Sequence, residues 1–281
     1  MARVAFVDGR YVPLRVPAIG IEDRGYQFAD GVYEVIKVLG RRPRDLERHL
    51  DRLERSLAAL TISAPMSRCA LRSVLAETLR RNRLDDALLY IQVSRGVAAR
   101  NHVFPQQARP SLVVTVRRPA FPGPAERERG VKVITRPDLR WGRCDIKSIS
   151  LLPNVLARQA AAAAGAREAW LVDRDGKVTE GSSSNAYIVD AGGALITHPL
   201  CERILGGITR SVVLELARDD GIEVVERPFT IDEARGASEA ALSSTSSWLL
   251  PVTAIDGAAV GGGRPGPVVW RLMGLYGARF A

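Results

Sequence analysis

Hydrophobic and polar residues alternate along this chain with the two periods of regular secondary structure. Apolar residues at every second position predict half-buried strands, and apolar residues at steps of three and four predict amphipathic helices. The leucines from Leu46 to Leu60 follow the second spacing and predict a helix over residues 46–60. Further helices are predicted over residues 67–82, 152–164, 208–219 and 268–280. Strands are predicted over residues 4–7, 11–14, 33–39, 87–93, 112–116, 131–135, 169–172, 177–179, 185–189, 194–197, 222–225 and 240–243.

A stretch rich in proline and glycine separates two groups of predicted elements. Residues 118–124 read Arg-Pro-Ala-Phe-Pro-Gly-Pro, a composition typical of an interdomain linker. We therefore predict a linker over residues 119–124, between a small N-terminal α/β domain (residues 1–118) and a larger C-terminal domain (residues 125–281). Because both parts mix strands and helices, the predicted fold class is α+β.

The overall composition indicates a soluble globular protein. Of the 281 residues, 46% are hydrophobic and 25% are charged, which are ordinary proportions for such proteins. No apolar run approaches the roughly 20 residues that a membrane-spanning helix needs, and the N-terminus lacks the layout of a signal peptide. Cys69, Cys144 and Cys201 are odd in number, far apart and without metal-ligand spacing. We therefore expect a cytoplasmic protein without disulfides, zinc or contact with a membrane.

The formal net charge of +9 and the pI near 10 make nucleic-acid binding a second possible function. The distribution of the charge argues against it, because the arginines are spread along the whole chain without a basic tail or a basic patch that contains aromatic residues. A positive surface would instead favour anionic substrates and cofactors.

Lysine is scarce among the basic residues. The 40 lysines and arginines include only Lys37, Lys132, Lys147 and Lys177 as lysines. Lysine can lose its proton near neutral pH and attack a carbonyl as a free amine, which arginine cannot do. Lys147 lies between a segment with Trp and Cys and an Ala-rich predicted helix, whereas the sequence predicts surface positions for the other three. Lys147 is therefore a candidate for a Schiff base; the alternative is a solvated lysine in front of a helix.

Two segments could hold an anion. Gly206 and Gly207 lead into the predicted helix over residues 208–219, and the free N–H groups at a helix start bind phosphate well. The hydroxyl of Thr209 adds a donor. The Ser/Thr run over residues 243–247 offers a second set of hydroxyl and amide donors. The alternatives are an ordinary helix start and a polar turn.

Three further segments contain groups suited to an amino-acid ligand. Glu180 lies among small polar residues and can bind a ligand nitrogen, although a carboxylate that caps a loop would look the same. Residues 24–34 form a predicted loop with aromatic residues, glycines and charges, a composition that suggests function. Arg100 stands two residues from His102 and can bind a carboxylate; the alternative is a solvated loop with a lone histidine. Together these groups match the requirements of a pyridoxal-phosphate enzyme that acts on amino acids.

Four strings resemble, in the same order, the fold-type IV pyridoxal-phosphate aminotransferases, and among them the bacterial D-amino-acid aminotransferases most closely. These strings are RGYQFADGVYEV, RCDIKS followed by LL and VLA, VTEGSSSN and GITR, and the resemblance runs from about residue 4 to the end. It implies a small α/β domain, a larger domain built around a pseudo-barrel, and a homodimer with pyridoxal 5'-phosphate at the domain interface.

The resemblance also implies roles for single residues. Lys147 matches the lysine that forms the Schiff base with the cofactor and then moves a proton as general base and acid. Glu180 matches the carboxylate that pairs with the ring nitrogen of the cofactor. The remaining matches to cofactor-binding residues are Arg52 for the phosphate, Ile208, Thr209 and Thr245 for its amide and hydroxyl partners, and Leu205 for packing on the ring.

Tyr33, Arg100 and His102 match the group that holds the substrate carboxylate in the D-specific enzymes, where the arginine and the histidine come from the neighbouring subunit. Branched-chain L-aminotransferases and aminodeoxychorismate lyases share the lysine and the glutamate but lack this Arg-x-His loop. Three places depart from the closest pattern: Ala29 replaces a glycine, Pro153-Asn154 replaces a pair of small residues, and Trp248 replaces a charged residue. Trp248 therefore either reshapes the side-chain pocket or packs in the core.

The implied activity is transamination between a D-amino acid, such as D-alanine or D-glutamate, and a 2-oxo acid, such as 2-oxoglutarate or pyruvate. The nearer alternative is another enzyme of the same fold, namely a branched-chain or (R)-amine transaminase or an aminodeoxychorismate lyase. The distant alternative is a basic nucleic-acid-binding protein.

Overall fold

The computed structural model describes residues 3–16, 18–118 and 121–279 and divides the chain into two compact units. Unit 1 comprises Met1–Ala120 together with Ile146–Ser150, and unit 2 comprises Phe121–Asp145 and Leu151–Ala281. Residues 119 and 120 of the predicted linker lie outside the described residues, and its last residue, Pro124, is the first residue of a helix. The short segment that carries Lys147 packs with unit 1, although sequence order alone assigns it to the second domain.

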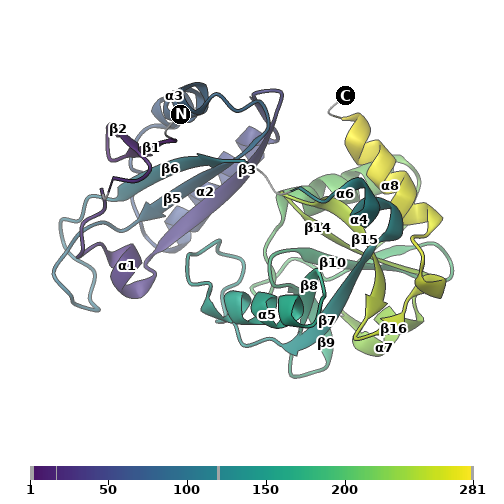
Figure 1. The fold of residues 1–281 in the computed structure, drawn as a ribbon. Coiled ribbons are helices and arrows are strands. Elements are labelled where there is room, and N and C mark those ends of the chain that lie inside the picture. The colour runs from purple at the N-terminus through teal and green to yellow at the C-terminus, as the bar shows by residue number, and fades with distance from the viewer. Residues whose placement is uncertain (1–2, 17, 119–120, 280–281) are drawn as a thin grey trace. The chain divides into compact units, whose positions relative to one another are not determined.

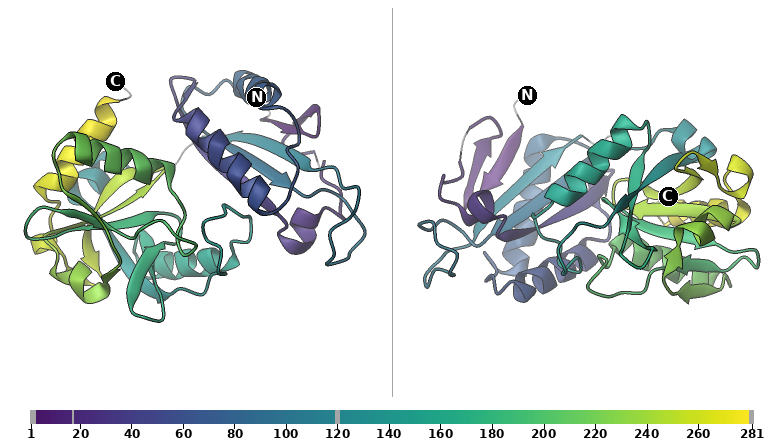
Figure 2. Two further views of the ribbon diagram at one scale, coloured as in Figure 1. Left: turned by 180° about the vertical axis from the view of Figure 1, so that it is seen from behind. Right: turned by 90° about the horizontal axis from the view of Figure 1, so that it is seen from below.

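Unit 1 is an antiparallel sheet with helices on one face (Figures 1 and 2). The strand order is β2-β1-β6-β5-β3-β4. The strands are β1 (Val4–Val7), β2 (Arg10–Pro13), β3 (Gly31–Leu39), β4 (Arg42–Pro43), β5 (Ala87–Ser94) and β6 (Ser111–Arg117), and the helices are α1 (Arg24–Phe28), α2 (Leu46–Ala59) and α3 (Arg68–Asn82). Alternate residues of the central strands, such as Ile36 and Ile91, pack on Leu50 and Leu75 of the two long helices. This core fixes the register of β3, which carries Tyr33.

Unit 2 is built on a mixed sheet with the order β12-β11-β10-β14-β15-β7-β8-β9-β13, and β16 pairs with β15. Its strands are β7 (Val131–Pro137), β8 (Glu168–Val172), β9 (Lys177–Gly181), β10 (Asn185–Val189), β11 (Leu195–Thr197), β12 (Val224–Glu226), β13 (Phe229–Thr230), β14 (Glu239–Ser244), β15 (Trp248–Ile255) and β16 (Ala258–Ala259). Its helices are α4 (Pro124–Arg129), α5 (Leu152–Ala163), α6 (Ile208–Asp219), α7 (Ile231–Gly236), α8 (Pro267–Ala278) and a 3-10 turn over Gly261–Gly263.

The two outermost strands of this sheet, β12 and β13, are joined by only Arg227 and Pro228. Three Cα–Cα steps reach at most about 11 Å, so the sheet must curl until its ends lie close together. The curled sheet, visible around the label β10 in Figure 1, is the pseudo-barrel expected for the larger domain.

Most predicted elements are present within a few residues, and helix α6 has the predicted bounds. Strand β15 was not predicted, and it contains Pro251, a residue that ordinarily argues against a strand in the middle of a sheet. The structure accommodates this proline because pairing with β7 begins at Val252, after it. Residue 280, the predicted end of the last helix, lies outside the described residues. Among the described residues, no helix has the length and apolar character to cross a membrane.

Candidate active site

Lys147 is half-buried in unit 1, beside the start of β3. The Tyr33 N–H donates to the Lys147 carbonyl at 2.9 Å, and the Lys147 N–H donates to the Ser56 hydroxyl at 3.3 Å. The Lys147 amine lies 4.3 Å from the centre of the Tyr33 ring. The backbone of this lysine is thus held on both sides, and its amine faces one of the predicted substrate-binding residues.

The other lysines agree only in part with the predicted surface positions. Lys132 is exposed and Lys177 is half-buried. Lys37 is 2% exposed, so the prediction that it lies on the surface is wrong. Strand β3 pairs on both sides at this end, and the chain folds back so that the Arg44 N–H donates to the Lys37 carbonyl at 2.8 Å. Lys147 is therefore not the only lysine withdrawn from solvent.

Arg52, the predicted phosphate-binding residue, lies on helix α2 in a buried ionic group with Glu34 and His49. Arg52 donates to both Glu34 oxygens, at 2.7 and 2.8 Å, and His49 Nδ1 donates to the same carboxylate at 2.7 Å. Burial acts to raise the pKa of Glu34, but the Arg52 charge and the hydrogen bonds from both partners outweigh it and lower this pKa to about 2. Burial lowers the pKa of His49, so its ring is neutral at pH 7. No local pattern in the sequence indicates that Glu34 pairs with Arg52.

Glu34→Gln is expected to destabilise the protein by about 3–5 kcal/mol at pH 7, because it removes the buried carboxylate to which the Arg52 guanidinium donates twice. The lowered pKa means that the ionised Glu34 stabilises the folded state fully above pH 4.5, its ordinary pKa, and that this contribution disappears as the pH falls through about 2. The difference in the free energy of unfolding between the native protein and Glu34→Gln should therefore become smaller as the pH falls from 4.5 to about 2. Urea unfolding between pH 7 and pH 2.5 measures it.

Glu77→Gln is the matched control for this experiment. Arg80 and Arg81 also lower the pKa of Glu77 to about 2, but its side chain meets them in solvent, where ion pairs contribute little. If Glu34→Gln changed the free energy of unfolding no more than Glu77→Gln does, the buried group would not be a stabilising one.

Arg100 and His102, the predicted carboxylate-binding pair, lie together against one aromatic ring. Arg100 Cζ is 4.6 Å from the centre of the Phe28 ring, and the His102 ring centre is 5.3 Å from it. Arg24 of helix α1 holds this loop by donating to the carbonyls of Asn101 and His102. Both predicted side chains are exposed. Among the described residues of unit 1, no hydrogen bond, ion pair or ring contact joins this pair to Tyr33 or Lys147.

Asp30 connects the same loop to the start of β3. It accepts from Arg24 Nε at 2.8 Å and from Arg95 Nε and Nη2 at 2.8 and 3.0 Å. Burial acts to raise the pKa of Asp30, but the hydrogen bonds and charges of the two arginines lower it. The preceding Ala29 has a φ of 55°, a left-handed conformation that favours glycine, which explains why glycine is the familiar residue there.

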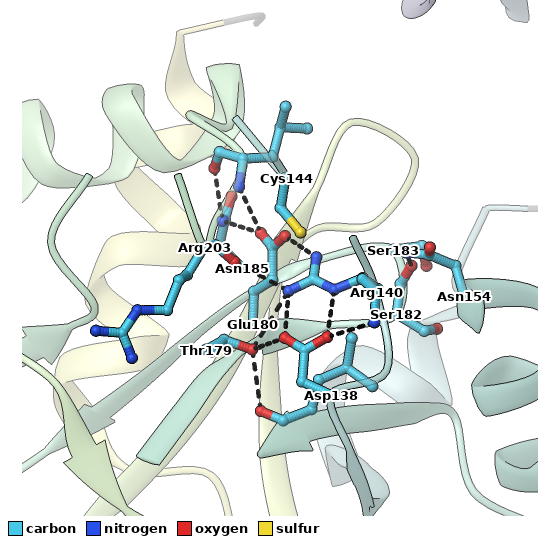
Figure 3. Close-up of polar contacts among 12 residues, drawn as sticks. Asp138, Arg140, Cys144, Asn154, Thr179, Glu180, Ser182, Ser183, Asn185 and Arg203 are labelled. Carbon is cyan, nitrogen blue, oxygen red and sulfur yellow. Dashed lines mark hydrogen bonds and ion pairs between the residues drawn. The ribbon is translucent and has the colours of Figure 1, made fainter. Parts of the chain in front are cut away.

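Glu180 lies in strand β9 of unit 2, one residue beyond the strand predicted over residues 177–179. The strand continues to Gly181 because Trp170 of β8 pairs with that glycine. Figure 3 shows three donors around the Glu180 carboxylate. Arg140 Nη1 donates to Oε1, and Oε2 accepts from Asn185 Nδ2 at 2.9 Å and from the Leu205 N–H at 3.1 Å. The carboxylate is buried and fixed in orientation.

Glu168 holds the serine turn that follows Glu180. Its two oxygens accept from the hydroxyls of Ser182, Ser183 and Ser184 and from the Ser183 N–H. Gly181 is required here, since a Cβ would lie 2.2 Å from the Ser184 hydroxyl. The turn between β9 and β10 is thus fixed on the inside by a buried carboxylate.

Gly207 caps helix α6, and Asn185 packs tightly against it. The first N–H groups of the 12-residue helix, including those of Ile208 and Thr209, have no acceptor within the helix. A Cβ on Gly207 would lie 2.0 Å from Asn185 Oδ1, and Asn185 Nδ2 also donates to the Leu205 carbonyl at 3.0 Å. Asn185 therefore joins Glu180 to the loop that leads to the helix start.

Thr245 lies in the turn between β14 and β15. Asn185 pairs with Ser243 of β14, so this turn and the start of α6 are both anchored next to Asn185. Trp248, at the end of the turn, has a φ of 60°. Its ring packs against Tyr276 at 5.4 Å and Arg127 at 5.3 Å. Of the two alternatives for Trp248, packing within unit 2 is therefore the one observed.

Several residues that build the site were not predicted, namely Arg24, Glu34, Arg140, Glu168 and Asn185. Asn185 ends the string VTEGSSSN, and Arg24 and Glu34 lie in RGYQFADGVYEV, so the positions of these three were usable signals. Arg140 and Glu168 are charged residues whose partners lie 40 and 14 positions away in sequence. Such pairs carry no local pattern.

Known proteins resemble this chain over most of its length. The family model described as "Amino-transferase class IV" matches residues 31–255. The D-alanine aminotransferase of Bacillus licheniformis is 43% identical over 93% of this chain and 91% of its own length.

Two solved structures have the same fold. The branched-chain amino acid aminotransferase of Escherichia coli has a TM-score of 0.92 at 24% identity and covers 100% of this chain and 95% of its own. The T.th. branched-chain amino acid aminotransferase with pyridoxamine 5'-phosphate has a TM-score of 0.89 at 27% identity and covers 98% of this chain and 93% of its own.

Proposed function

Because the chain belongs to the class IV aminotransferases, we propose that it is a D-alanine aminotransferase. The observation that carries this proposal is the similarity to D-alanine aminotransferases, which reaches 43% identity and extends over nearly the whole length of both chains. The gathered pair of Arg100 and His102 supports it, because this pair is the feature that the branched-chain enzymes and the lyases are expected to lack.

Class IV aminotransferases use pyridoxal phosphate, which stores the amino group between the two half-reactions. The residues of unit 2 fit this group. The fixed Glu180 carboxylate suits a protonated ring nitrogen, and the start of helix α6 suits the phosphate because Ile208 and Thr209 present N–H groups there. We assign Leu205 to packing on the ring, and Thr245 and Arg52 to further contacts with the phosphate.

The substrate-side chemistry follows from four side chains. Lys147 would hold the cofactor covalently through its amine, and the same amine would take a proton from the substrate Cα as general base and return it as general acid. Arg100 and His102 bind the substrate carboxylate, and the Tyr33 hydroxyl donates a further hydrogen bond to it. With the carboxylate anchored on one side, only the D-enantiomer directs its Cα–H toward Lys147.

The test is the visible absorption of the purified protein with pyridoxal phosphate, recorded before and after D-alanine and, separately, L-leucine. Loss of the Schiff-base band with D-alanine but not with L-leucine, together with release of pyruvate, supports the proposal if the band returns and glutamate forms when 2-oxoglutarate is then added. Loss of the band with L-leucine alone would move the chain to the branched-chain enzymes. A response to (R)-amines or to aminodeoxychorismate alone would move it to one of the other two activities.

A homodimer is part of this proposal. The lack of contact between the exposed Arg100–His102 pair and Lys147 within the described residues of unit 1 favours a site completed by a second copy of the chain. Helix α5 also presents an apolar stripe, with Leu152, Val155 and Leu156 each more than half exposed. Such a stripe is typical of a surface that is covered in an assembly.

Mixing an inactive variant with one that works poorly at low D-alanine tests the shared site. In a hybrid of a Lys147→Ala chain and an Arg100→Ala chain, one of the two sites receives both native residues if Arg100 acts across the dimer. Equimolar reassembly should restore about one quarter of native activity at low D-alanine. No recovery in verified hybrids would place Arg100 in the same site as its own Lys147. The cytoplasmic location stays a prediction.

A further inference from the structure

Arg140 is a buried arginine that joins two carboxylates of unit 2 (Figure 3). Its side chain is 6% exposed. One end of the guanidinium pairs with Glu180 Oε1, and the other forms a fork on Asp138, with Nε at 2.9 Å and Nη2 at 2.7 Å from its two oxygens. Burial acts to lower the pKa of Arg140, but the two carboxylates raise it, so the guanidinium stays charged.

The guanidinium is itself held in one orientation. Besides the Asp138 fork, Nη2 donates to the Arg203 carbonyl at 3.0 Å and contacts the Thr179 hydroxyl at 3.3 Å. The Thr179 hydroxyl in turn donates to Asp138 at 2.7 Å. Arg140 therefore presents a fixed positive charge to one oxygen of Glu180.

The two oxygens of Glu180 have different partners. Oε1 meets the charge of Arg140, whereas Oε2 meets two neutral donors, Asn185 and the Leu205 N–H. Hydrogen bonds and positive charge stabilise the ionised form of a carboxyl group. A proton between this carboxylate and a ring nitrogen can lie on the carboxylate oxygen or on the nitrogen. A donor that stabilises the ionised carboxylate favours the proton on the nitrogen.

We propose that Arg140 is a positioning residue that keeps Glu180 ionised and thereby keeps the shared proton on the ring nitrogen of the cofactor. The proposal rests on the proposed pairing of Glu180 with that nitrogen. It distinguishes the charge of Arg140 from the neutral contacts of Asn185, which orient the carboxylate without stabilising its charge to the same degree.

The test measures the protonation of the ring nitrogen directly. Holoenzyme is prepared with pyridoxal phosphate carrying 15N in the ring, and the 15N chemical shift is recorded for the native protein, Arg140→Lys, Arg140→Met and Arg203→Met. Arg203→Met is the matched control, because the Arg203 side chain pairs with Asp173 at 2.7 Å and only its carbonyl meets Arg140. Melting temperatures and the dissociation constant of the cofactor are measured alongside.

The native protein and Arg203→Met are expected to give a pyridinium signal. Arg140→Met should shift toward unprotonated pyridine and lose roughly 10- to 100-fold in kcat, the usual scale for a partner that orients a ligand. Arg140→Lys keeps the positive charge but loses the two-point contact with Asp138, and we expect a 15N chemical shift between those of the native protein and Arg140→Met. If Arg140→Met does not fold, the shift of Arg140→Lys still tests the proposal. An unchanged pyridinium signal in the folded Arg140 variants would overturn the proposal. Failure of the native protein to bind the cofactor would instead overturn the proposed function.

Discussion

Lys147→Ala is expected to lose transamination by roughly 10³-fold or more while the protein still folds. The amine lies 4.3 Å from the centre of the Tyr33 ring, which cannot form a Schiff base in its place. The backbone hydrogen bonds at residue 147 involve no side-chain atom of the lysine, so alanine can keep them. Initial rates with D-alanine and 2-oxoglutarate, together with the melting temperature, measure both parts of this expectation.

Borohydride reduction identifies the lysine independently of activity. Reduction of the native holoenzyme should attach the cofactor to the peptide that contains Lys147, and Lys147→Ala should take up none. Lys132→Ala, which alters an exposed lysine, should behave like the native protein. Lys37 is also buried and is therefore the alternative lysine to consider. Attachment of the cofactor to the Lys37 peptide would contradict the assignment of Lys147.

Arg100→Ala is expected to raise KM for D-alanine by about 10- to 100-fold, since a charge-assisted contact with a carboxylate contributes about 1.5–3 kcal/mol. The change in kcat should be smaller, because the carboxylate that we assign to Arg100 takes no part in bond breaking. A carboxylate-free amine should be affected little. Steady-state kinetics with both amino donors measures this difference.

Arg41→Ala provides the control for a lost surface charge. Arg41 pairs with Asp85 in solvent on unit 1 and lies outside the loop that carries Arg100. Its KM values should stay native. Equal increases of KM for D-alanine and for the amine in Arg100→Ala would show that the loop has changed shape, and Arg100 would then not bind the carboxylate.

The sequence was sufficient where local patterns determine the structure. Helix α6 was predicted with its bounds because a glycine pair precedes it and Gly221 follows its C-cap. The match of four long strings then indicated the fold and the candidate site together. Both signals depend on residues that are close in sequence.

The sequence was insufficient where a side chain depends on a distant partner. Arg140 and Glu180 are 40 positions apart, and Glu34 and Arg52 are 18 apart. The burial of Lys37 depends on how two other strands flank it. The strand through Pro251 exists because the neighbouring pairs of β14 and β7 accommodate the proline. In each case the deciding contact forms only when the chain has folded.

The short segment Ile146–Ser150 completes unit 1 from within the sequence of unit 2. The chain therefore passes between the units at three points, near residues 120, 145 and 150. A nick within residues 119–124 would leave two fragments, of which the second still carries the segment that adds to β3 through Ser148. We expect such fragments to reassociate, because residues 146–150 of the second fragment pack with unit 1 in the first. During synthesis, likewise, unit 1 cannot be completed until the ribosome has released residues 146–150, so Lys147 belongs to the last segment that joins unit 1.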